Sequence, residues 1–256
     1  MKNPNIKLSV DLLLEICALM MQSGANTKRV VDTINRFADA LHLESHALIS
    51  HKSIIMTLID KKTQNTYTVV TQIPAYHANF WIVSEISVSS WKAIDRNWHY
   101  DEIKNRIEQI KNRKSYPFIL ILFFVSLADA GFANLFGGDY KNMIMAFVAT
   151  LGGLLTVKLA NFYHFNPYIR TYFAAFIASA IAGIGVIYHF GLHPEIALAT
   201  AVLFLIPGLA LVNSFNDFLN NHILNGMVRF VNGFLMVLSI GLGIISTMLL
   251  LNLNTL

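Results

Sequence analysis

Charged residues are scarce in this sequence. Lys, Arg, Asp and Glu together make up 13% of the 256 residues, against about 25% in an average soluble domain. Hydrophobic residues make up 55%, and the mean hydropathy is +0.52. So few charges could not cover so much apolar side chain in a soluble fold, and the same composition excludes an intrinsically disordered or collagen-like chain. The sequence therefore indicates an integral membrane protein.

Cysteine and the motifs of familiar enzymes are also missing. The sequence has one cysteine, Cys17, which excludes an internal disulfide and a metal cluster held by cysteines. It contains no His-Glu-x-x-His, no Gly-x-Ser-x-Gly, no Walker loop and no Gly-x-Gly-x-x-Gly. The nine histidines show no metal-ligand spacing. We therefore expect a protein that is not an enzyme and that uses no metal and no cofactor.

The charges that are present are unevenly distributed. Residues 1–115 contain 15 of the 19 basic residues and 11 of the 15 acidic ones, and the remaining 141 residues contain four of each sign. The net charge of +4 therefore lies wholly in the N-terminal part. This asymmetry predicts two domains: a polar domain over residues 1–115, which we call the head, and a transmembrane domain over residues 116–256.

The head has the pattern of a small α+β domain. Apolar residues at helical spacing predict two helices within residues 7–41, with Thr27 as the N-cap of the second. Helical patterns return at residues 80–95 and 101–112. Between them lie three segments typical of strands, at Ala47–Ser50, Ser53–Asp60 and Tyr67–Ile73.

The first apolar run, Leu12 to Met21, has an alternative interpretation as the core of a signal peptide. Asp11 opens this run and Glu15 interrupts it. Charges in these positions are untypical of a signal peptide, so the sequence favours an amphipathic helix.

Five apolar stretches follow Pro117, each close to the ~20 residues that a membrane-spanning helix needs. They cover Phe118–Phe136, Asn142–Asn161, Tyr172–Phe190, Ile196–Val212 and Met227–Leu251. The alternative, a wholly buried helical core in a soluble protein, does not account for five such segments in succession. We therefore predict an α-helical integral membrane protein with five transmembrane helices after a small cytoplasmic α+β domain.

Basic residues near the ends of the spans predict the orientation, because such residues stay in the cytoplasm. Five of them precede the first span, and Lys158, Arg170 and Arg229 flank the loops after the second and fourth spans. The loop after the first span has only Lys141. We therefore expect the N-terminus in the cytoplasm and the C-terminus outside.

One carboxylate lies inside the first apolar stretch. Asp129 stands among small residues, which are Ala128, Ala130, Gly131 and Ala133. An acidic side chain in a bilayer is costly and ordinarily faces a partner or a water-filled path. We interpret Asp129 as a candidate substrate or proton site; the alternative is a hydrogen-bonded structural aspartate.

Pro207 and Gly208 interrupt the fourth apolar stretch. Proline removes a backbone donor and glycine permits an irregular turn, so the helix is expected to break or kink there. Transporters use the backbone groups and dipole ends of broken helices to bind ions and carboxylates. An ordinary proline kink is the alternative.

Further polar residues gather around this break and at the cytoplasmic ends of neighbouring spans. We interpret them as a pathway for substrate on the cytoplasmic side. A structural salt bridge between Asp217 and Arg229 is the alternative for that pair. The candidates are Lys158, Asn161, Asn213, Asp217, Arg229 and Asn232.

Three segments, in order along nearly the whole chain, resemble the threonine/serine exporter family. Gly24-Ala25-Asn26-Thr27-Lys28-Arg29-Val30-Val31-Asp32-Thr33 resembles the family's opening signature, with Asn26 where many members have an acidic residue. Gly131-Phe132-Ala133-Asn134-Leu135-Phe136-Gly137-Gly138 is similar to its end of span one and adds Asn134 to the candidates. The series Pro207-Gly208, Asn213, Asp217, Gly226 and Arg229 resembles its span-four motif.

This resemblance implies a place for the chain in a larger assembly. It looks like the longer, head-bearing (YjjP-type) subunit of the split form of the family, in the bacterial inner membrane. The resemblance implies a smaller, YjjB-type membrane subunit as the partner in a hetero-oligomer, and no nucleic-acid partner. Family members export threonine and serine, and the split type is linked with succinate and related dicarboxylates.

Three functional hypotheses follow. The first is a subunit of a secondary exporter of small carboxylate-bearing metabolites, in which Asp129 binds an ammonium group or carries a proton. The second is a membrane-embedded hydrolase, since Gly137-Gly138-Asp139 loosely resembles an intramembrane aspartyl-protease motif with Phe136 in place of its first glycine. It needs a second acid in contact with Asp129, for which Asp217 is the candidate. The third is a non-transporting assembly or sensing subunit.

Overall fold

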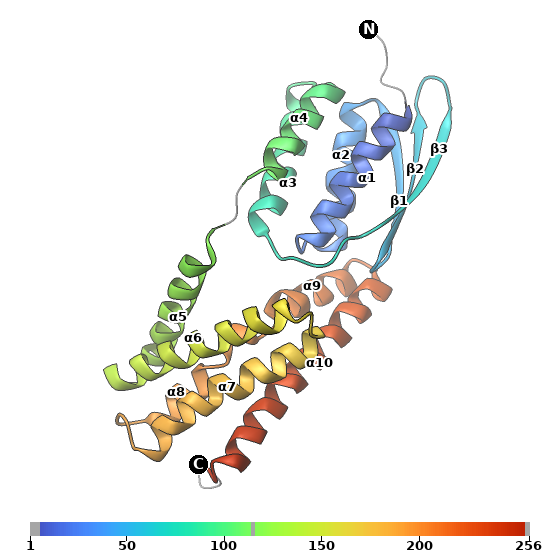
Figure 1. Ribbon diagram of the computed structural model, residues 1–256. Helices are drawn as coiled ribbons and strands as arrows, with labels where there is room; N and C mark the ends of the chain where they lie inside the picture. Colours follow the sequence, from blue (N-terminus) through green and yellow to red (C-terminus); the bar gives the residue numbers. More distant parts are fainter. Residues whose placement is uncertain (1–5, 114–115, 254–256) are drawn as a thin grey trace. The chain divides into compact units, whose positions relative to one another are not determined.

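The computed structural model describes residues 6–113 and 116–253 (Figure 1). The chain divides into two compact units. Unit 1 contains Met1–Lys114 together with Leu209–Phe230, and unit 2 contains Ser115–Gly208 together with Val231–Leu256. The predicted division into a head over residues 1–115 and a transmembrane domain over residues 116–256 stays a prediction, because no membrane is present in the structure. By contacts alone, the segment Leu209–Phe230 groups with the N-terminal residues.

Unit 1 combines helices with one antiparallel sheet, as the head's sequence predicts. The sheet has the strand order β1-β2-β3, and its strands are joined by two hairpins. The second hairpin turns where Asp60 Oδ1 accepts hydrogen bonds from the backbone N–H of Lys62 and Thr63. The N-terminal elements are α1 (Ile6–Gln22), α2 (Thr27–Ala40), β1 (Leu43–Ile49), β2 (Ser53–Asp60), β3 (Thr66–Gln72), α3 (Phe80–Asp95) and α4 (Tyr100–Lys111).

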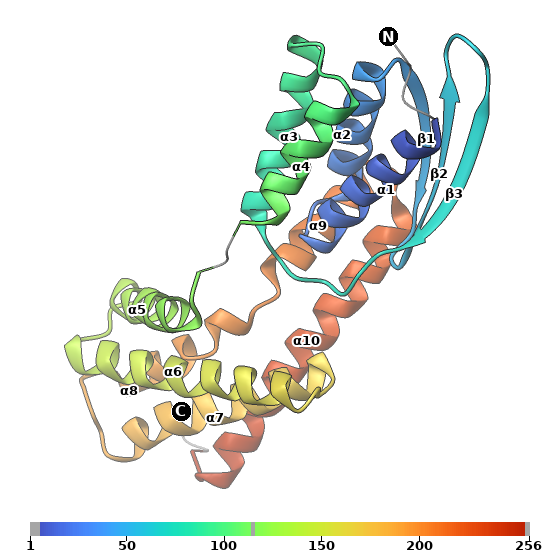
Figure 2. The same cartoon turned by 45° about the horizontal axis from the view of Figure 1, so that its top comes forward.

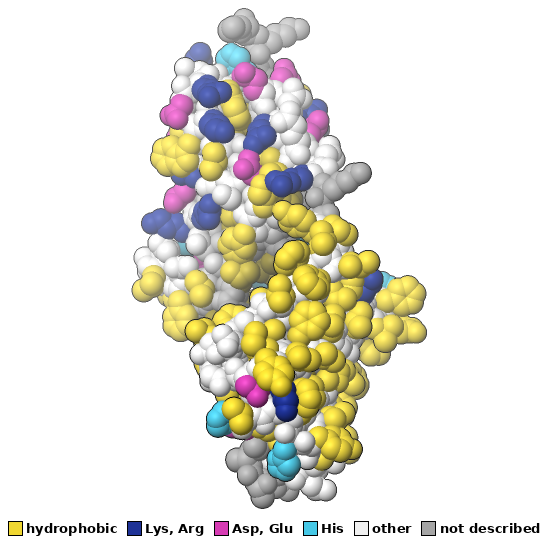
Figure 3. Space-filling view, turned by 90° about the vertical axis from the view of Figure 1, so that its left-hand side faces the viewer, with side chains coloured by type: hydrophobic (Ala, Val, Ile, Leu, Met, Phe, Trp, Pro, Cys, Tyr) yellow, Lys and Arg dark blue, Asp and Glu magenta, His cyan; other side chains and the backbone are white. Residues whose placement is uncertain are grey.

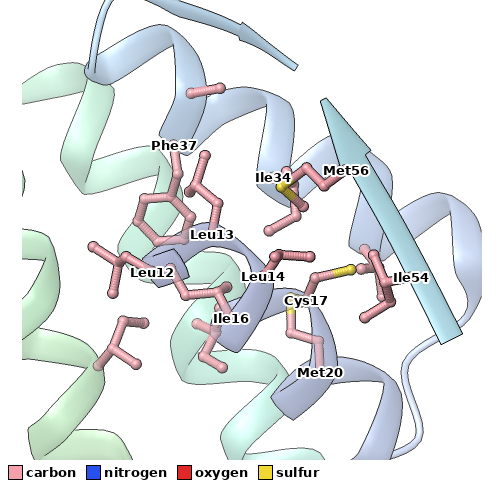
Figure 4. Close-up of a cluster of buried hydrophobic side chains, with 14 of the residues drawn as sticks. Leu12, Leu13, Leu14, Ile16, Cys17, Met20, Ile34, Phe37, Ile54 and Met56 are labelled. Carbon is pink, nitrogen blue, oxygen red and sulfur yellow. The ribbon is translucent and has the colours of Figure 1, made fainter. Parts of the chain in front are cut away.

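Helix α1 forms the centre of the unit 1 core. It contacts α2, α3, α4, β2 and β3, and its apolar side chains meet those of α2 and β2 in Figure 4. Buried residues lie all around the helix, among them Val10, Leu12, Leu13, Ile16 and Met20, because neighbours surround it on several sides. The segment is a core helix of unit 1. Burial also raises the pKa of the Cys17 thiol to about 12, which leaves it protonated and unreactive at neutral pH.

Unit 2 consists almost entirely of apolar helices, which Figure 2 shows from a second direction. Its elements are α5 (Phe118–Leu135), α6 (Tyr140–Phe162), α7 (Pro167–Ile187), α8 (Pro194–Thr200), the short 3-10 helix η1 (Leu203–Leu205) and the greater part of α10 (Ile223–Leu250). Among the described residues, four helices are long and apolar enough to cross a membrane: α5, α6, α7 and α10. A fifth span results if Pro194–Leu205 and Gly208–Leu219 count as one broken span.

The surface of unit 2 is unusually apolar. Ile119, Phe124 and Leu135 of α5 are 76%, 60% and 75% exposed, and hydrophobic side chains cover most of the unit 2 face seen in Figure 3. A soluble monomer rarely exposes contiguous apolar patches of this extent. These helices therefore need lipid or another membrane protein around them.

The fourth apolar stretch is broken, as Pro207 and Gly208 predict. After η1 the backbone turns extended at Ile206 (φ −62°, ψ 124°), and a new helix, α9 (Gly208–Leu219), begins directly after Pro207. Helix α9 from Leu209 onward and the first turns of α10 belong to unit 1. The polar candidates Asn213, Asp217 and Arg229 thus lie on these two helices.

Candidate functional site

The turn between α1 and α2 is shaped by a glycine and an asparagine. Gly24 has φ +96°, and a Cβ there would lie 3.1 Å from Tyr76 Oη, so the position favours glycine. Asn26 caps α2, because its side chain accepts a hydrogen bond from the backbone N–H of Arg29 at 2.8 Å. The prediction that Thr27 caps this helix is therefore wrong: Thr27 is its first residue.

Thr27 is bound instead by Asp217 of α9. The Thr27 backbone N–H donates to Asp217 Oδ1 at 2.8 Å, and the Thr27 hydroxyl donates to Oδ2 at 3.1 Å. Asp217 is fully buried, and Arg229 Nε of α10 lies 3.1 Å from its Oδ2. A carboxylate is favoured at this place because it meets unpaired N–H groups and the positive end of the dipole at the N-terminus of α2.

The rest of the turn is bound by three more side chains of α9 and α10. Asn213 donates to the carbonyl of Gly24 at 2.7 Å, and Arg229 Nη2 donates to that of Ala25 at 2.9 Å. Asn225 donates to Thr27 Oγ1 at 3.1 Å and to the carbonyl of Ile49 at 2.8 Å. We call Asn213, Asp217, Asn225 and Arg229, with the turn Gly24–Thr27, the turn-binding network.

Asp217 and Arg229 form an ion pair within the turn-binding network, as expected from the alternative interpretation of these two residues as a structural salt bridge. Both carboxylate oxygens of Asp217 have donors, and Arg229 binds a backbone carbonyl as well as the carboxylate. Asn225 was missed by the sequence reasoning, although it precedes Arg229 by four residues and therefore shares its helix face.

Two titratable groups near Arg229 are kept neutral. Burial, with the nearby charges of Arg229 and Lys52, lowers the pKa of His51. Burial raises the pKa of Tyr76, although Arg229 acts in the opposite direction. The charge of Arg229 is therefore balanced by Asp217 rather than by these neighbours.

A second polar site lies within the apolar helices of unit 2. Asp129 of α5 is 3% exposed, and its Oδ2 accepts a hydrogen bond of 2.6 Å from the Thr150 hydroxyl of α6. Ser126, one turn before Asp129, is fully buried, and its hydroxyl has no hydrogen-bond partner in the described part of the chain. Thr150 and Ser126 were missed by the sequence reasoning. Serine and threonine in an apolar helix carry little signal, because they can bond to their own backbone.

The other candidates of unit 2 have separate partners. Lys158 Nζ lies 4.2 Å from the centre of the Phe118 ring, and Asn161 accepts a hydrogen bond from Arg170. Asn232 accepts one of 2.8 Å from the Tyr168 hydroxyl. Asn134 is exposed at the end of α5, where its carbonyl accepts from the N–H of Gly137.

The two candidate acids, Asp129 and Asp217, belong to different units and have different partners. Asp129 is paired with Thr150, whereas Asp217 is paired with Thr27 and Arg229 in the other unit. No group of three or more His, Cys, Asp or Glu side chains within residues 6–113 and 116–253 is placed to hold a metal ion.

The chain matches a protein-family model over most of its length. Residues 11–251 match the ThrE family model, described as "Putative threonine/serine exporter". No solved structure matches the chain at a significant level.

Among curated proteins, the chain is similar to transport proteins. It is 28% identical over 235 residues to the "Probable succinate transporter subunit YjjP" of Klebsiella aerogenes, covering 91% of this chain and 90% of that protein. The protein of the same name in Escherichia coli K12 is 28% identical over 232 residues, covering 90% of each. A "Probable threonine/serine exporter" of Mycobacterium tuberculosis is 22% identical over 240 residues, which are 92% of this chain and 45% of that protein. These relatives are named as transporters and an exporter, not as enzymes.

Proposed function

The chain belongs to the threonine/serine exporter (ThrE) family, and from this premise we propose that it is one subunit of a secondary exporter of small carboxylate-bearing metabolites. Its family and its apolar helices make it a multi-pass membrane transport protein. The proposed substrates are amino acids of the threonine and serine type or dicarboxylates of the succinate type, as in the names of its relatives. The proposed location is the bacterial inner membrane, with the N-terminus in the cytoplasm and the C-terminus outside.

The buried carboxylate of Asp129 is the observation that carries this proposal. A carboxylate at the centre of a membrane helix costs about 2.5–3.5 kcal/mol on insertion scales. One hydrogen bond from Thr150 offsets part of that cost. A group kept at this cost in a transport protein is well suited to meet a substrate or a proton on its way across.

Asp129 suits both proposed substrate classes in different ways. A zwitterionic amino acid needs an anionic site for its ammonium group, which Asp129 supplies. A dicarboxylate needs cationic partners, and in that case Asp129 serves as the carrier of a coupled proton. Lys158 and Asn161, near the end of α6, and Asn232 of α10 remain our candidates for the pathway that leads to it.

We assign a different task to Asp217 and Arg229. Within the described residues, the hydrogen bonds and the ion pair of these two side chains are with the turn Gly24–Thr27 and with each other, apart from a weak contact of Arg229 with Met21. In our proposal they hold the N-terminal elements onto α9 and α10, and substrate binding rests first on Asp129.

We further propose that transport needs a second chain. The word "subunit" in the names of the two enterobacterial relatives supports a partner, and the exposed apolar surface of unit 2 offers room for one beside lipid. A smaller, YjjB-type membrane subunit is the partner we propose.

The test is transport in proteoliposomes that contain this chain alone, the proposed partner alone, or both. Uptake of labelled threonine, serine and succinate is compared with and without a proton gradient. We expect transport with both chains and its loss, or loss of its proton coupling, in Asp129→Asn. The matched control is Glu195→Gln, which removes an exposed charge of unit 2 and should leave transport intact. Transport of none of the three substrates by the pair would refute the function, and wild-type transport by Asp129→Asn would refute the role of Asp129.

A further inference from the structure

Ser126 differs from most other hydroxyl residues of the described apolar helices. Ser179, Thr171, Thr156, Thr200 and Ser239 each donate to the backbone carbonyl four residues earlier. This local bond is how serine and threonine satisfy themselves inside a helix. Ser126 makes no such bond, although its Oγ is completely shielded. A buried hydroxyl without a partner is rare, and it calls for an explanation.

The place of Ser126 suggests that explanation. It precedes Asp129 by three residues, which puts the two side chains on one face of α5. From α6, the Thr150 hydroxyl donates to Asp129 Oδ2 at 2.6 Å. No residue in the described ranges donates to Asp129 Oδ1. Ser126 thus lies one turn before Asp129 on α5, Thr150 binds Asp129 from α6, and the Ser126 hydroxyl has no partner of its own among the described residues.

We infer that Ser126, Asp129 and Thr150 form a binding site for a small cation. The inference rests on the proposed function and deepens it by naming the chemistry that Asp129 recognises. Hard oxygen ligands suit a hard cation, and the single carboxylate balances one positive charge. A hydroxyl that donates to Asp129, as that of Thr150 does, still has lone pairs for the cation. The unpaired Ser126 oxygen supplies a third ligand group.

Two cations have this chemistry: a sodium ion and the ammonium group of an amino acid. The experiment separates them by measuring binding rather than transport. The full chain, purified in detergent alone and with its proposed partner, is titrated with labelled sodium ion and with labelled threonine. Succinate, which has no ammonium group, is titrated in parallel.

Ser126→Ala is the central variant, because the structure predicts opposite effects on two measurements. Removing an unsatisfied buried hydroxyl should raise the melting temperature of the unliganded protein. Removing a ligand oxygen should at the same time lower the affinity for the cation about tenfold, as expected for one interaction with a charged group. Thr150→Val removes the other hydroxyl and should also lower the affinity about tenfold.

Ser179→Ala is the matched control. Ser179 is an equally buried serine of unit 2, but its hydroxyl is paired with the carbonyl of Ala175 and with Thr247. This variant should lose stability and keep its affinity for the cation.

Saturable sodium binding that falls in Ser126→Ala assigns the site to the ion. Threonine binding that falls in the same variant, with succinate binding unchanged, assigns it to the ammonium group. Binding of neither cation, or equal affinity in the wild type, Ser126→Ala and Thr150→Val, overturns the inference. The exporter function survives that outcome if the paired chains still transport, so the two failures are distinguishable.

Discussion

Replacing Asp217 by Asn should destabilise unit 1 strongly, because it leaves Arg229 as a buried cation without its anion. The Asp217 side chain is fully buried and that of Arg229 is 12% exposed. Removing one partner of a buried pair costs about 3–5 kcal/mol. An asparagine has one side-chain oxygen where the carboxylate has two, so one of the two hydrogen bonds that Asp217 accepts from Thr27 would also be lost. We expect a loss of about 3 kcal/mol, which lowers the melting temperature on the order of 10 °C.

Tryptophan fluorescence measures this effect in the full chain. The three tryptophans, Trp81, Trp91 and Trp98, all belong to unit 1, so their emission follows the unfolding of that unit. Glu85→Gln is the matched control. Its partner is Arg106 at 2.5 Å, but both side chains are about 30% exposed, and this loss should cost at most about 1 kcal/mol.

A double-mutant cycle with Arg229→Met decides whether the two charges act as a pair. The double variant should be less destabilised than the sum of the single variants, by about 2 kcal/mol. Additive losses within about 0.5 kcal/mol would show that Asp217 and Arg229 stabilise the fold independently, and would refute the reasoning.

Three further results are expected. Gly24→Ala should cost about 1–3 kcal/mol in the same fluorescence assay, because it combines a positive φ with a close approach to Tyr76; unchanged stability would contradict the turn geometry. Gly243→Ala should destabilise the chain by about 1–3 kcal/mol in thermal unfolding followed by circular dichroism, because its Cβ would lie 2.8 Å from a backbone carbonyl oxygen of α7. Gly241→Ala should leave the stability unchanged, because the space around Gly241 is open. Equal effects of the two variants would argue against this packing. The pKa of His51 is lowered in the folded state, so the unfolded chain binds the proton first as the pH falls below about 6.5. The free energy of unfolding should therefore decrease from that pH toward lower pH. His51→Gln should flatten that decrease.

The apolar helices could be predicted from the sequence because the signal is local. Length and hydropathy alone predict α5, α6, α7 and α10, and Pro207 predicts the break before α9. The number of spans and their placement in a membrane stay predictions, since the structure gives four candidates or five.

The turn-binding network could not be predicted in the same way. Asp217 and Thr27 are 190 residues apart in the sequence, and spacing within a helix does not reveal which distant backbone a side chain will bind. Asn26 rather than Thr27 is the N-cap of α2 for a related reason. Both residue types are good caps, and the contact with Asp217 takes up the hydroxyl of Thr27.

Unit 1 is discontinuous in the sequence, and this has a consequence for how the protein is made. The carbonyl of Ala25 is bound by a residue 204 positions later. At a synthesis rate of about 5–20 residues per second, roughly 10–40 s pass between the two. Throughout that interval the N-terminal elements lack the side chains that bind their first turn, while the apolar helices between them are being synthesised. The N-terminal elements therefore complete their fold only after most of the membrane helices exist, and a ribosome-bound chain shorter than about 230 residues should be cleaved by protease near Gly24.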